Sequence, residues 1–436
     1  MRKLILEKAK NKRIVILGFG MEGQSSLGYL LSIQLANKIL VADQNTEIIH
    51  HPLIRKNNIE VLSGEDYLSL LQKDDFILKS PGVQVKKFRP ELFSHSQTSL
   101  FLEKFGSQII GITGTKGKST SSTMMYQILE EQNKEAFLVG NIGQPAFDMI
   151  PQIKESSCIV YELSAHQLQC VKQGPRMAIL LNLMPEHLDY FASLEAYYQA
   201  KLQLFAHQRG DSFAFYHDKT KSKSPSSHFP TRRLSTQIKG EQIFLEEKAI
   251  LTLSDLKYLL GHHHLENIQA LIELSNFLHL DLTKTLDSIK NFHPLPHRQE
   301  LLGDKNGIRF INDSISTIPQ SAIQAIKASG EVDYLILGGL DRGIEYDELI
   351  TFLSESKFKK VYFLGEAGKR MLEELKSLSH SMDFEYTQAA NLQGIQNELL
   401  QIPRGTVLLS PAAASYDHFK NFEERGNYFR DIFSKI

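Results

Sequence analysis

Residues 109–131 read IIGITGTKGKSTSSTMMYQILEE, and no other stretch says more about the architecture of this chain. The stretch opens with an apolar run that predicts a buried strand, and it ends in a helical pattern. The glycine-rich loop between them can surround phosphate oxygens with backbone N–H groups, and Lys118 can reach the β- and γ-phosphates of a nucleotide. The strict P-loop pattern has glycine where this chain has Ile112. The sequence therefore predicts a variant triphosphate-binding loop. The alternative is a glycine turn that only joins a strand to a helix.

The same alternation of a short apolar run, a glycine or polar loop and a helical pattern recurs on both sides of this stretch. We predict strands at 13–17, 38–43 and 76–79, then at 109–112, 158–163 and 177–183, and finally at 308–313, 334–337, 361–364 and 407–410. This alternation is typical of α/β layers with mainly parallel sheets. We predict an α/β protein of three domains: a Rossmann-like domain at 1–98, a central P-loop ATPase-like domain at 99–291 and a Rossmann-like domain at 292–436.

The composition of the chain excludes several classes of protein. Its 436 residues are 42% hydrophobic and 23% charged, as in ordinary globular proteins, so disordered, fibrous and disulfide-framework classes fit poorly. The formal charge of -1 gives no overall reason to bind nucleic acid or an anionic membrane. The sequence shows no signal peptide and no run that approaches the ~20 apolar residues of a spanning helix. We therefore expect a cytoplasmic protein without membrane insertion or nucleic-acid binding.

A second glycine loop follows the first predicted strand. Gly18, Gly20 and Gly23 form the G-x-G-x-x-G pattern, and Asp43 ends the next strand 20 residues after Gly23. This is the dinucleotide fingerprint with its ribose-binding acid, and alone it favours a nicotinamide-dependent oxidoreductase. A dehydrogenase has no use for a triphosphate loop, however. The two loops are therefore better interpreted as binding two nucleotides, one that is part of the substrate and one that supplies energy. The alternative is a glycine turn that is needed only for tight packing between the strand and the helix.

Polar side chains follow two further predicted strands. Glu162 ends one of them, and His187 and Asp189 come after the next. Ligands of open α/β sheets gather at the carboxyl ends of the strands, so we expect these side chains beside the phosphate loop. Oxygen and imidazole ligands there suit Mg²⁺ that also takes substrate phosphate. Two alternatives stand against this: Glu162 as an exposed strand-end carboxylate, and a P-loop switch protein without bond-forming chemistry.

Short motifs in chain order strengthen the enzyme interpretation. They are the GTKGKST loop, Asn141-Ile142-Gly143, Glu162-Leu163-Ser164, the segment 182–189, Gln199-Ala200-Lys201-Leu202, Asn267, His297-Arg298 and Asn312-Asp313-Ser314. In this order and approximate spacing they resemble the Mur ligase family, the ATP-dependent amide-forming enzymes of peptidoglycan assembly. The segments 410–417 and 419–426 are similar to members that add glutamate to UDP-N-acetylmuramoyl-L-alanine through an acyl phosphate. The resemblance covers essentially the whole chain.

The resemblance implies a role for each matching position. The UDP-sugar site would contain Gly18, Gly20, Gly23, Asp43, Ser80, Asn141 and Gln167, together with His187. The ATP site would contain Thr115, Lys116, Gly117, Lys118, Ser119, Thr120, Asn267, Arg298 and Asp313. One Mg²⁺ would meet Ser119 and Glu162, and a second would meet His187 and a carbamylated Lys201. Lys118, His187 and Lys201 would be the catalytic residues.

The glutamate site is where this chain departs from the family pattern. The resemblance implies that Thr317, Arg342, Ser415 and Phe422 bind the incoming amino acid, but it also implies lysines where this chain has Ile315 and Arg342. Arginine can grip a carboxylate bidentately, so we expect Arg342 to anchor the α-carboxylate. We expect D-glutamate as the substrate and a monomeric enzyme. L-glutamate, another amino acid or a folate-polyglutamylating activity are the alternatives.

Overall fold

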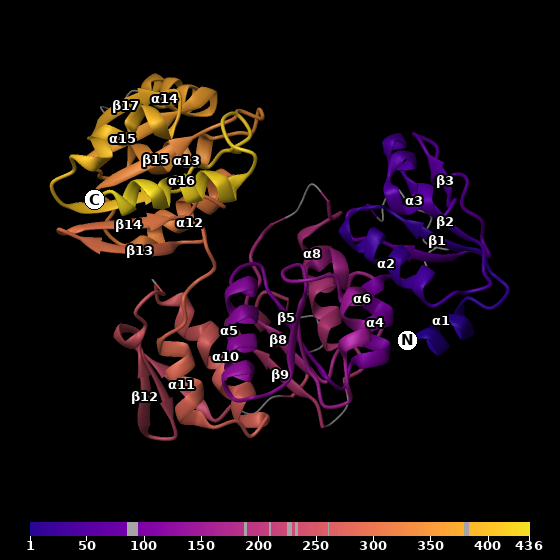
Figure 1. Cartoon of the computed structure of the whole chain (residues 1–436). Coiled ribbons are helices and arrows are strands. Elements are labelled where there is room, and N and C mark those ends of the chain that lie inside the picture. The colour runs from indigo at the N-terminus through magenta and orange to yellow at the C-terminus, as the bar shows by residue number, and fades with distance from the viewer. Residues whose placement is uncertain are drawn as a thin grey trace. The chain divides into compact units, whose positions relative to one another are not determined.

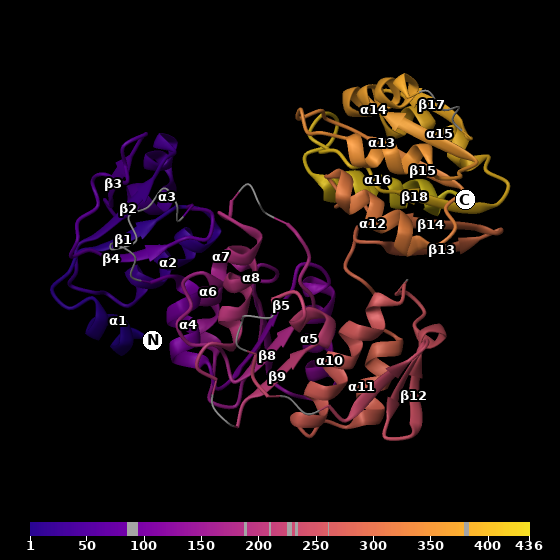
Figure 2. The ribbon, with the colours of Figure 1, turned by 180° about the vertical axis from the view of Figure 1, so that it is seen from behind.

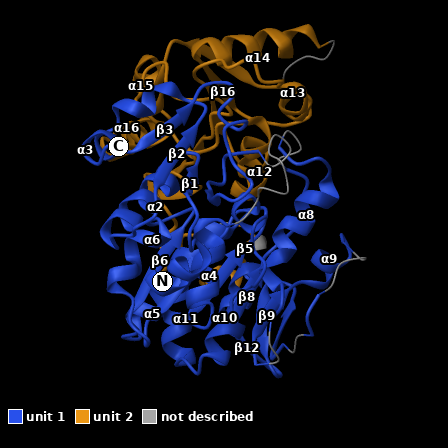
Figure 3. Cartoon of the chain, turned by 90° about the vertical axis from the view of Figure 1, so that its right-hand side faces the viewer, with its two compact units in different colours: residues 1–251, 265–289 blue, residues 252–264, 290–436 orange. Residues whose placement is uncertain are grey.

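The computed structural model describes residues 1–84, 95–186, 190–208, 211–224, 229–231, 234–259, 261–378 and 383–436. The chain forms two compact units (Figure 3). Unit 1 consists of residues 1–251 and 265–289, and unit 2 consists of residues 252–264 and 290–436. Within the described part of the chain, no helix combines the length and the apolar character needed to cross a membrane.

Unit 1 begins with a four-stranded parallel sheet. Its strands are β1 Ile14–Leu17, β2 Ile39–Asp43, β3 Glu60–Ser63 and β4 Phe76–Lys79, in the order β3-β2-β1-β4. The helices of this part are α1 Arg2–Lys8, α2 Met21–Ser32, α3 Pro52–Lys56 and α4 Gln97–Phe105. All four residues of β1 are buried, and the chain leaves this strand through the glycine loop that precedes α2 (Figure 1).

A second parallel sheet of five strands completes the core of unit 1. Its strands are β5 Ile109–Thr113, β6 Ala136–Gly140, β7 Cys158–Glu162, β8 Met177–Leu180 and β9 Phe213–Tyr216, in the order β6-β7-β5-β8-β9. The accompanying helices are α5 Lys118–Glu131, α6 Ala146–Met149, α7 Ala165–Leu168, α8 Leu194–Leu202, α9 Asp218–Lys221, α10 His263–Phe277 and α11 Leu282–Lys290. Because β7 and β8 flank β5 in parallel, the segments after these three strands leave the sheet at one edge.

A small three-stranded sheet was not expected from the sequence. It comprises β10 Thr236–Lys239, β11 Gln242–Leu245 and β12 Lys248–Thr252, and β10 and β11 pair antiparallel. The buried carboxylate of Glu273 on α10 holds its first strand by accepting hydrogen bonds from the backbone N–H and the hydroxyl of Thr236, both at 2.6 Å.

Unit 2 is built on a six-stranded sheet. Its strands are β13 Glu300–Lys305, β14 Ile308–Asn312, β15 Tyr334–Gly338, β16 Lys360–Leu364, β17 Glu385–Ala389 and β18 Gly405–Leu409, in the order β13-β14-β18-β15-β16-β17. Only β13, at the edge, pairs antiparallel to its neighbour within this described sheet. The helices are α12 Pro319–Ser329, α13 Asp347–Ser354, α14 Gly365–Ser377, α15 Leu392–Leu400 and α16 Phe422–Ser434.

Helices cover both faces of the sheet in unit 2. Leu335 and Leu337 of β15 pack into one apolar cluster with α12, α13 and α14, whereas Ile336 packs into another with α15 and α16 (Figures 1 and 2). A strand that is buried on both faces is apolar at every position, which is why these strands appear as continuous hydrophobic runs. The predicted α/β class with mainly parallel sheets is confirmed; the domain boundaries near residues 98 and 292 stay a prediction.

Candidate active site and nucleotide cavity

The phosphate loop joins β5 to α5. Gly117 precedes the helix with φ +82°, and Lys118, Ser119 and Thr120 form the first helical turn, whose N–H groups have no partner within the helix. The side chain of Lys118 donates a hydrogen bond to the backbone oxygen of Thr115 at 2.8 Å. The loop therefore has the geometry that the sequence predicts for phosphate binding.

Asn182, two residues after the end of β8, holds the phosphate loop in place through two hydrogen bonds. Its side-chain oxygen accepts from the backbone N–H of Lys116 at 2.9 Å, and its amide donates to the backbone oxygen of Lys116 at 3.0 Å. The ammonium of Lys116 forms an ion pair with Glu186 at 2.6 Å. The sequence prediction placed Asn182 in a motif but gave it no role, because its two contacts join residues 66 positions apart.

Asn267 lies against the phosphate loop from α10. A Cβ atom placed on Gly117 would come within 2.5 Å of the side-chain nitrogen of Asn267. Two features therefore require glycine at position 117: its positive φ and the close approach of the Asn267 side chain. The structure brings together seven of the nine predicted ATP residues, Thr115 to Thr120 and Asn267.

Glu162 is the best candidate for a magnesium ligand. It is fully buried at the end of β7, next to β5, with one carboxylate oxygen accepting from the amide of Asn141 at 3.0 Å. Its other oxygen is buried and has no hydrogen-bond partner among the described residues. A buried, unmatched carboxylate oxygen is costly unless a cation meets it, so this position fits Mg²⁺. No cluster of three His, Cys, Asp or Glu that could hold a metal occurs in the described ranges.

Lys201 is buried near the end of α8. Its ammonium donates to the backbone oxygen of Gly114 at 2.8 Å and lies 4.9 Å from the ring centre of Tyr197. Burial, followed by the charge of Lys118, lowers the pKa of Lys201 well below its usual value. A neutral amine is the nucleophilic form, and that form is needed to react with carbon dioxide. His187, predicted to share a metal ion with Lys201, and Asp189, predicted beside the phosphate loop, lie outside the described residues.

A cavity of about 620 Å³ opens beside the first glycine loop of unit 1. Six of the eight predicted UDP-sugar residues line it: Gly18, Gly20, Asp43, Ser80, Asn141 and Gln167. Another of the eight, His187, lies outside the described residues. The remaining one, Gly23, serves packing instead, since a Cβ there would lie 2.1 Å from the backbone oxygen of Gly18. Asp43 holds the loop by accepting from the backbone N–H of Phe19 at 2.6 Å.

Glu22 also lines this cavity, and the sequence prediction missed it. Its carboxylate accepts from the amide of Gln167 at 2.6 Å. Burial raises the pKa of Glu22 to about 7, although the hydrogen bond from Gln167 and the charge of Lys79 oppose this shift. A charged residue inside the G-x-G-x-x-G loop was the only available signal.

The two remaining predicted ATP residues lie in unit 2. Asp313 follows β14, and its carboxylate accepts from the hydroxyl of Ser410 at 2.8 Å and from the backbone N–H of Gln299 at 3.1 Å. Burial raises the pKa of Asp313 to about 6, although these hydrogen bonds act to lower it. Arg298 has a buried guanidinium nitrogen, Nε, without a hydrogen-bond partner in the described part of the chain.

The predicted glutamate residues fall into two pairs at the carboxyl edge of the sheet in unit 2. Arg342 is exposed after β15, and its guanidinium lies 3.5 Å from the backbone oxygen of Thr317. Ser415 is buried after β18, and Phe422 begins α16. Ile315 is partly buried and offers no charge.

Arg425 on α16 connects the loops that carry the second pair. Its buried guanidinium donates to the backbone oxygens of Ala413 at 3.1 Å and Ser314 at 2.8 Å, and the hydroxyl of Ser314 donates to the backbone oxygen of Phe422 at 2.7 Å. Burial lowers the pKa of Arg425 to about 10. The sequence prediction did not include Arg425, although a buried arginine on an otherwise apolar helix face indicates such a cross-link.

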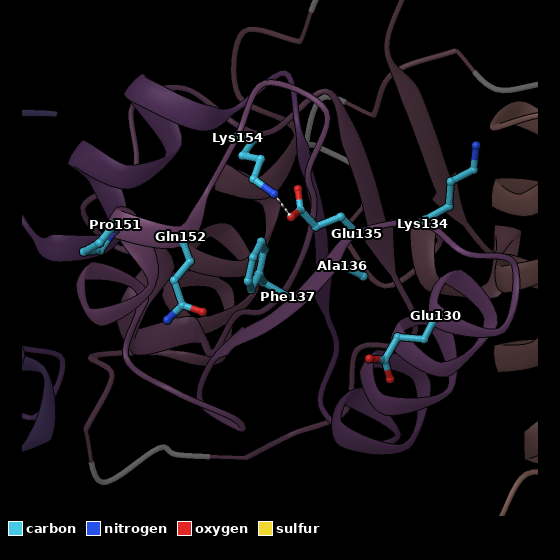
Figure 4. Close-up of a pocket in the computed structure, with 8 residues that line it drawn as sticks. All are labelled: Glu130, Lys134, Glu135, Ala136, Phe137, Pro151, Gln152 and Lys154. Atoms are coloured by element: carbon cyan, nitrogen blue, oxygen red, sulfur yellow. Dashed lines mark hydrogen bonds and ion pairs between the residues drawn. The ribbon is translucent and has the colours of Figure 1, made fainter.

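A second hollow of about 550 Å³ contains none of the predicted residues (Figure 4). It lies around the start of β6 and the end of α5, and two of its charged side chains, Lys154 and Glu135, form an ion pair at 2.6 Å. The phosphate loop stands at the opposite ends of these two elements.

Comparison with known families agrees with this geometry. The family model for the Mur ligase MurD-like N-terminal domain matches residues 12–98, and the model for the Mur ligase middle domain matches residues 112–274, which include the phosphate loop, Glu162 and Lys201. A relative from Elusimicrobium minutum is 32% identical over 98% of this chain and 99% of its own length. The chain belongs to the Mur ligase family. It is therefore an ATP-dependent ligase that forms amide bonds.

Members of the Mur ligase family resemble the chain over its full length. The relative from Elusimicrobium minutum and one from Streptococcus agalactiae serotype Ia, 30% identical over 98% of both chains, are each named UDP-N-acetylmuramoylalanine–D-glutamate ligase. Two solved structures from Thermotoga maritima share the fold. A UDP-N-acetylmuramate-alanine ligase has a TM-score of 0.56 and 17% sequence identity, and the match covers 97% of this chain and 99% of that chain. A MurF ligase has a TM-score of 0.57 and 16% sequence identity, and the match covers 98% of this chain and 97% of that chain.

Proposed function

We propose that this Mur ligase adds D-glutamate to UDP-N-acetylmuramoyl-L-alanine in cytoplasmic peptidoglycan precursor synthesis. The names of its full-length relatives support this substrate set. The observation that carries the ligase chemistry is the meeting of three groups at one edge of a parallel sheet: the phosphate loop of Lys118, the buried carboxylate of Glu162, and Lys201, which is bonded to Gly114 of that loop.

The reaction needs an activated carboxyl group, because a carboxylate is a poor acyl donor. Transfer of the γ-phosphoryl group of ATP onto the carboxylate of the alanyl substrate releases ADP and gives an acyl phosphate. The amine of glutamate then attacks the acyl carbon, so the amide bond forms while phosphate and a proton leave. Lys118 stabilises negative charge on the transferring phosphoryl group, and the first turn of α5 holds the other phosphates. Asn267 would complete the part of the ATP site that lies in unit 1, and Arg298 and Asp313 are the ATP-binding residues that we propose in unit 2.

Magnesium binding follows from the same residues. Ser119 and Glu162 would hold one ion, and His187 with a carbamylated Lys201 would hold a second. Carbamylation converts the amine of Lys201 to a carboxylate-like ligand, and its burial favours the neutral amine from which the carbamate forms. When bound, the ions supply charge stabilisation to the phosphoryl transfer.

The cavity of unit 1 would hold the UDP-sugar, and Thr317, Arg342, Ser415 and Phe422 of unit 2 would hold glutamate. Both carboxylates of glutamate need cationic or N–H partners when water is excluded. Arg342 would anchor the α-carboxylate in place of the lysines that the family pattern has at positions 315 and 342. We expect the enzyme to act as a monomer.

The test is a phosphate-release assay with UDP-N-acetylmuramoyl-L-alanine, ATP, Mg²⁺ and single amino acids. We expect release with D-glutamate and none with the other amino acids. Release with L-glutamate alone would overturn the stereochemistry and leave the ligase mechanism in place. Nicotinamide-dependent absorbance changes without phosphate release would overturn the ligase function and favour the oxidoreductase.

A further inference from the structure

The loop that carries Arg342 is held by the side chain of Arg370 from α14. The guanidinium of Arg370 binds both carboxylate oxygens of Asp341, from Nε at 2.7 Å and from Nη2 at 2.9 Å. The same Nη2 donates to the backbone oxygen of Ile344 at 2.6 Å. Asp341 and Ile344 stand on either side of Arg342 in the chain, so one side chain fixes the turn before and after the predicted glutamate anchor.

Further contacts fix Arg370 and Asp341 themselves. The guanidinium of Arg370 lies 4.5 Å from the ring centre of the buried Tyr346, and its Nη1 donates to Glu374, one helical turn further along α14, at 3.1 Å. The carboxylate of Asp341 also accepts from the backbone N–H of Gly343 at 2.9 Å. A two-pronged bond between guanidinium and carboxylate is both strong and directional, so the pair is held in one geometry.

The charge of Asp341 would otherwise act against glutamate binding. The hydrogen bonds from Arg370 lower the pKa of Asp341, so this carboxylate is ionised at neutral pH. A carboxylate next to a cationic anchor competes for that anchor with the carboxylate of a ligand and repels the ligand. Arg342 forms no ion pair with any residue that the structure describes, and its guanidinium lies 3.5 Å from the backbone oxygen of Thr317. Arg370 thus occupies Asp341 and leaves Arg342 available.

Resting on the proposed glutamate site, we propose that Arg370 is a positioning residue, which keeps the carboxylate of Asp341 away from Arg342 and so reserves the Arg342 guanidinium for the incoming amino acid. Arg370 acts through Arg342 and not on the reacting atoms. The phosphate loop and Glu162 belong to unit 1 and do not depend on this contact. Loss of Arg370 therefore weakens binding of the amino acid and leaves the groups of phosphoryl transfer in place.

The test is steady-state kinetics of the full-length enzyme with glutamate and ATP varied in turn. Arg370→Met keeps an unbranched apolar stem beside Tyr346 and removes the cation. We expect it to raise the KM for glutamate about fivefold, the effect of one exposed competing ion pair, with kcat and the KM for ATP nearly unchanged. An unchanged KM for glutamate, or a fall in kcat without a rise in that KM, would overturn the proposal.

The conservative variant gives a second measurement. Arg370→Lys keeps a positive charge beside Asp341 but loses the two-pronged contact, so the KM for glutamate should lie between those of the unchanged enzyme and Arg370→Met. If Arg370→Met does not fold, Arg370→Lys tests the proposal by itself, and an unchanged KM for glutamate in this variant would then overturn it.

A double variant separates the effect of charge from that of structure. Asp341→Asn in the Arg370→Met background removes the competing charge, so the KM for glutamate should return most of the way to that of the unchanged enzyme. A merely structural role of Arg370 predicts no recovery, because the double variant loses one more contact. An unchanged or still higher KM in the double variant would therefore overturn the proposal.

The matched control is Lys360→Met in the same unit. Lys360 forms an ion pair with Glu398 at 2.7 Å and lies 5.3 Å from the ring centre of Tyr362, so the control also removes a paired cation beside a tyrosine. It should leave the KM for glutamate unchanged, and a rise equal to that of Arg370→Met would overturn the proposal.

Arg342→Ala distinguishes this inference from the proposed function. If Arg342→Ala leaves the KM for glutamate unchanged, the proposed glutamate site fails and this inference fails with it. If Arg342→Ala raises that KM and Arg370→Met does not, this inference alone is overturned.

Discussion

In the proposed mechanism Lys118 stabilises charge on the transferring phosphoryl group, and it is not among the residues that line the UDP-sugar cavity. We expect Lys118→Ala to lower the rate of phosphate release by about 10²-fold or more, because a charge that stabilises the transition state is lost. Calorimetry with UDP should give unchanged affinity. Near-normal phosphate release from this variant would contradict the assignment of the loop.

Lys201 is buried in a setting that disfavours its charged form. If it acts as a carbamate, Lys201→Ala should lose most activity, and acetate or formate should restore part of it by entering the vacated ligand position. The matched control is Lys201→Met, which fills the space and leaves no room for the added carboxylate. Full activity of Lys201→Ala, or equal rescue of both variants, would count against the carbamate.

Arg342 is the exposed cation that the structure places near Thr317. Its planar guanidinium grips a carboxylate with two hydrogen bonds, which lysine cannot do. We therefore expect Arg342→Lys to raise the KM for glutamate roughly tenfold, with a much smaller change in the KM for ATP. Steady-state kinetics with each substrate varied in turn decides this, and an equal rise in both values would show that Arg342 has another role.

At the scale of elements, the loop between β5 and α5 depends on Gly117. Alanine there would adopt a positive φ and push against Asn267, at a cost of about 1–3 kcal/mol. We expect Gly117→Ala to raise the KM for ATP much more than that for the UDP-sugar. The control is Gly28→Ala inside α2, where a Cβ meets nothing within 4 Å and alanine should stabilise the helix. Equal effects of both variants on ATP would refute the role of the loop.

The strands differ in how well their sequences predict them. Every interior strand of the three large sheets was predicted, from β1 and β2 to β16 and β18, because strands buried on both faces are apolar throughout. The strands of these three sheets that were missed, β3, β6, β9, β13 and β17, all lie at sheet edges. Four of these strands, β3, β6, β13 and β17, are partly exposed along most of their length, so their residues give too weak an apolar pattern to be distinguished from loops.

The residues of the candidate site also differ in how well the sequence predicts them. Glycine loops and strand ends are local patterns, so the phosphate loop, Asp43 and Glu162 could be predicted. Glu22 and Arg425 could not, because their roles depend on partners such as Gln167 and Ser314, which are more than 100 residues away in the chain. Only packing of the whole sheet brings such pairs together.

At the scale of the whole molecule, one side chain of unit 1 joins two sites. Asn141 lines the UDP-sugar cavity, and its amide donates to Glu162, the proposed magnesium ligand, at 3.0 Å. A ligand that shifts Asn141 must therefore alter how Glu162 is held, and linkage requires the reverse effect to be equal. The same side chain thus provides a physical path between nucleotide binding and metal binding.

If Asn141 couples the two sites, UDP binding and Mg²⁺ binding must affect each other equally. In the unchanged enzyme, saturating UDP should change the Mg²⁺ affinity, and Mg²⁺ should change the UDP affinity by the same factor. Asn141→Ala should remove most of that factor and leave Glu162 with both oxygens unmatched. Calorimetric titrations of each ligand with and without the other measure both factors. Equal coupling in Asn141→Ala and in the unchanged enzyme would show that the two sites communicate through other groups, because the one side chain that touches both would then carry none of the coupling.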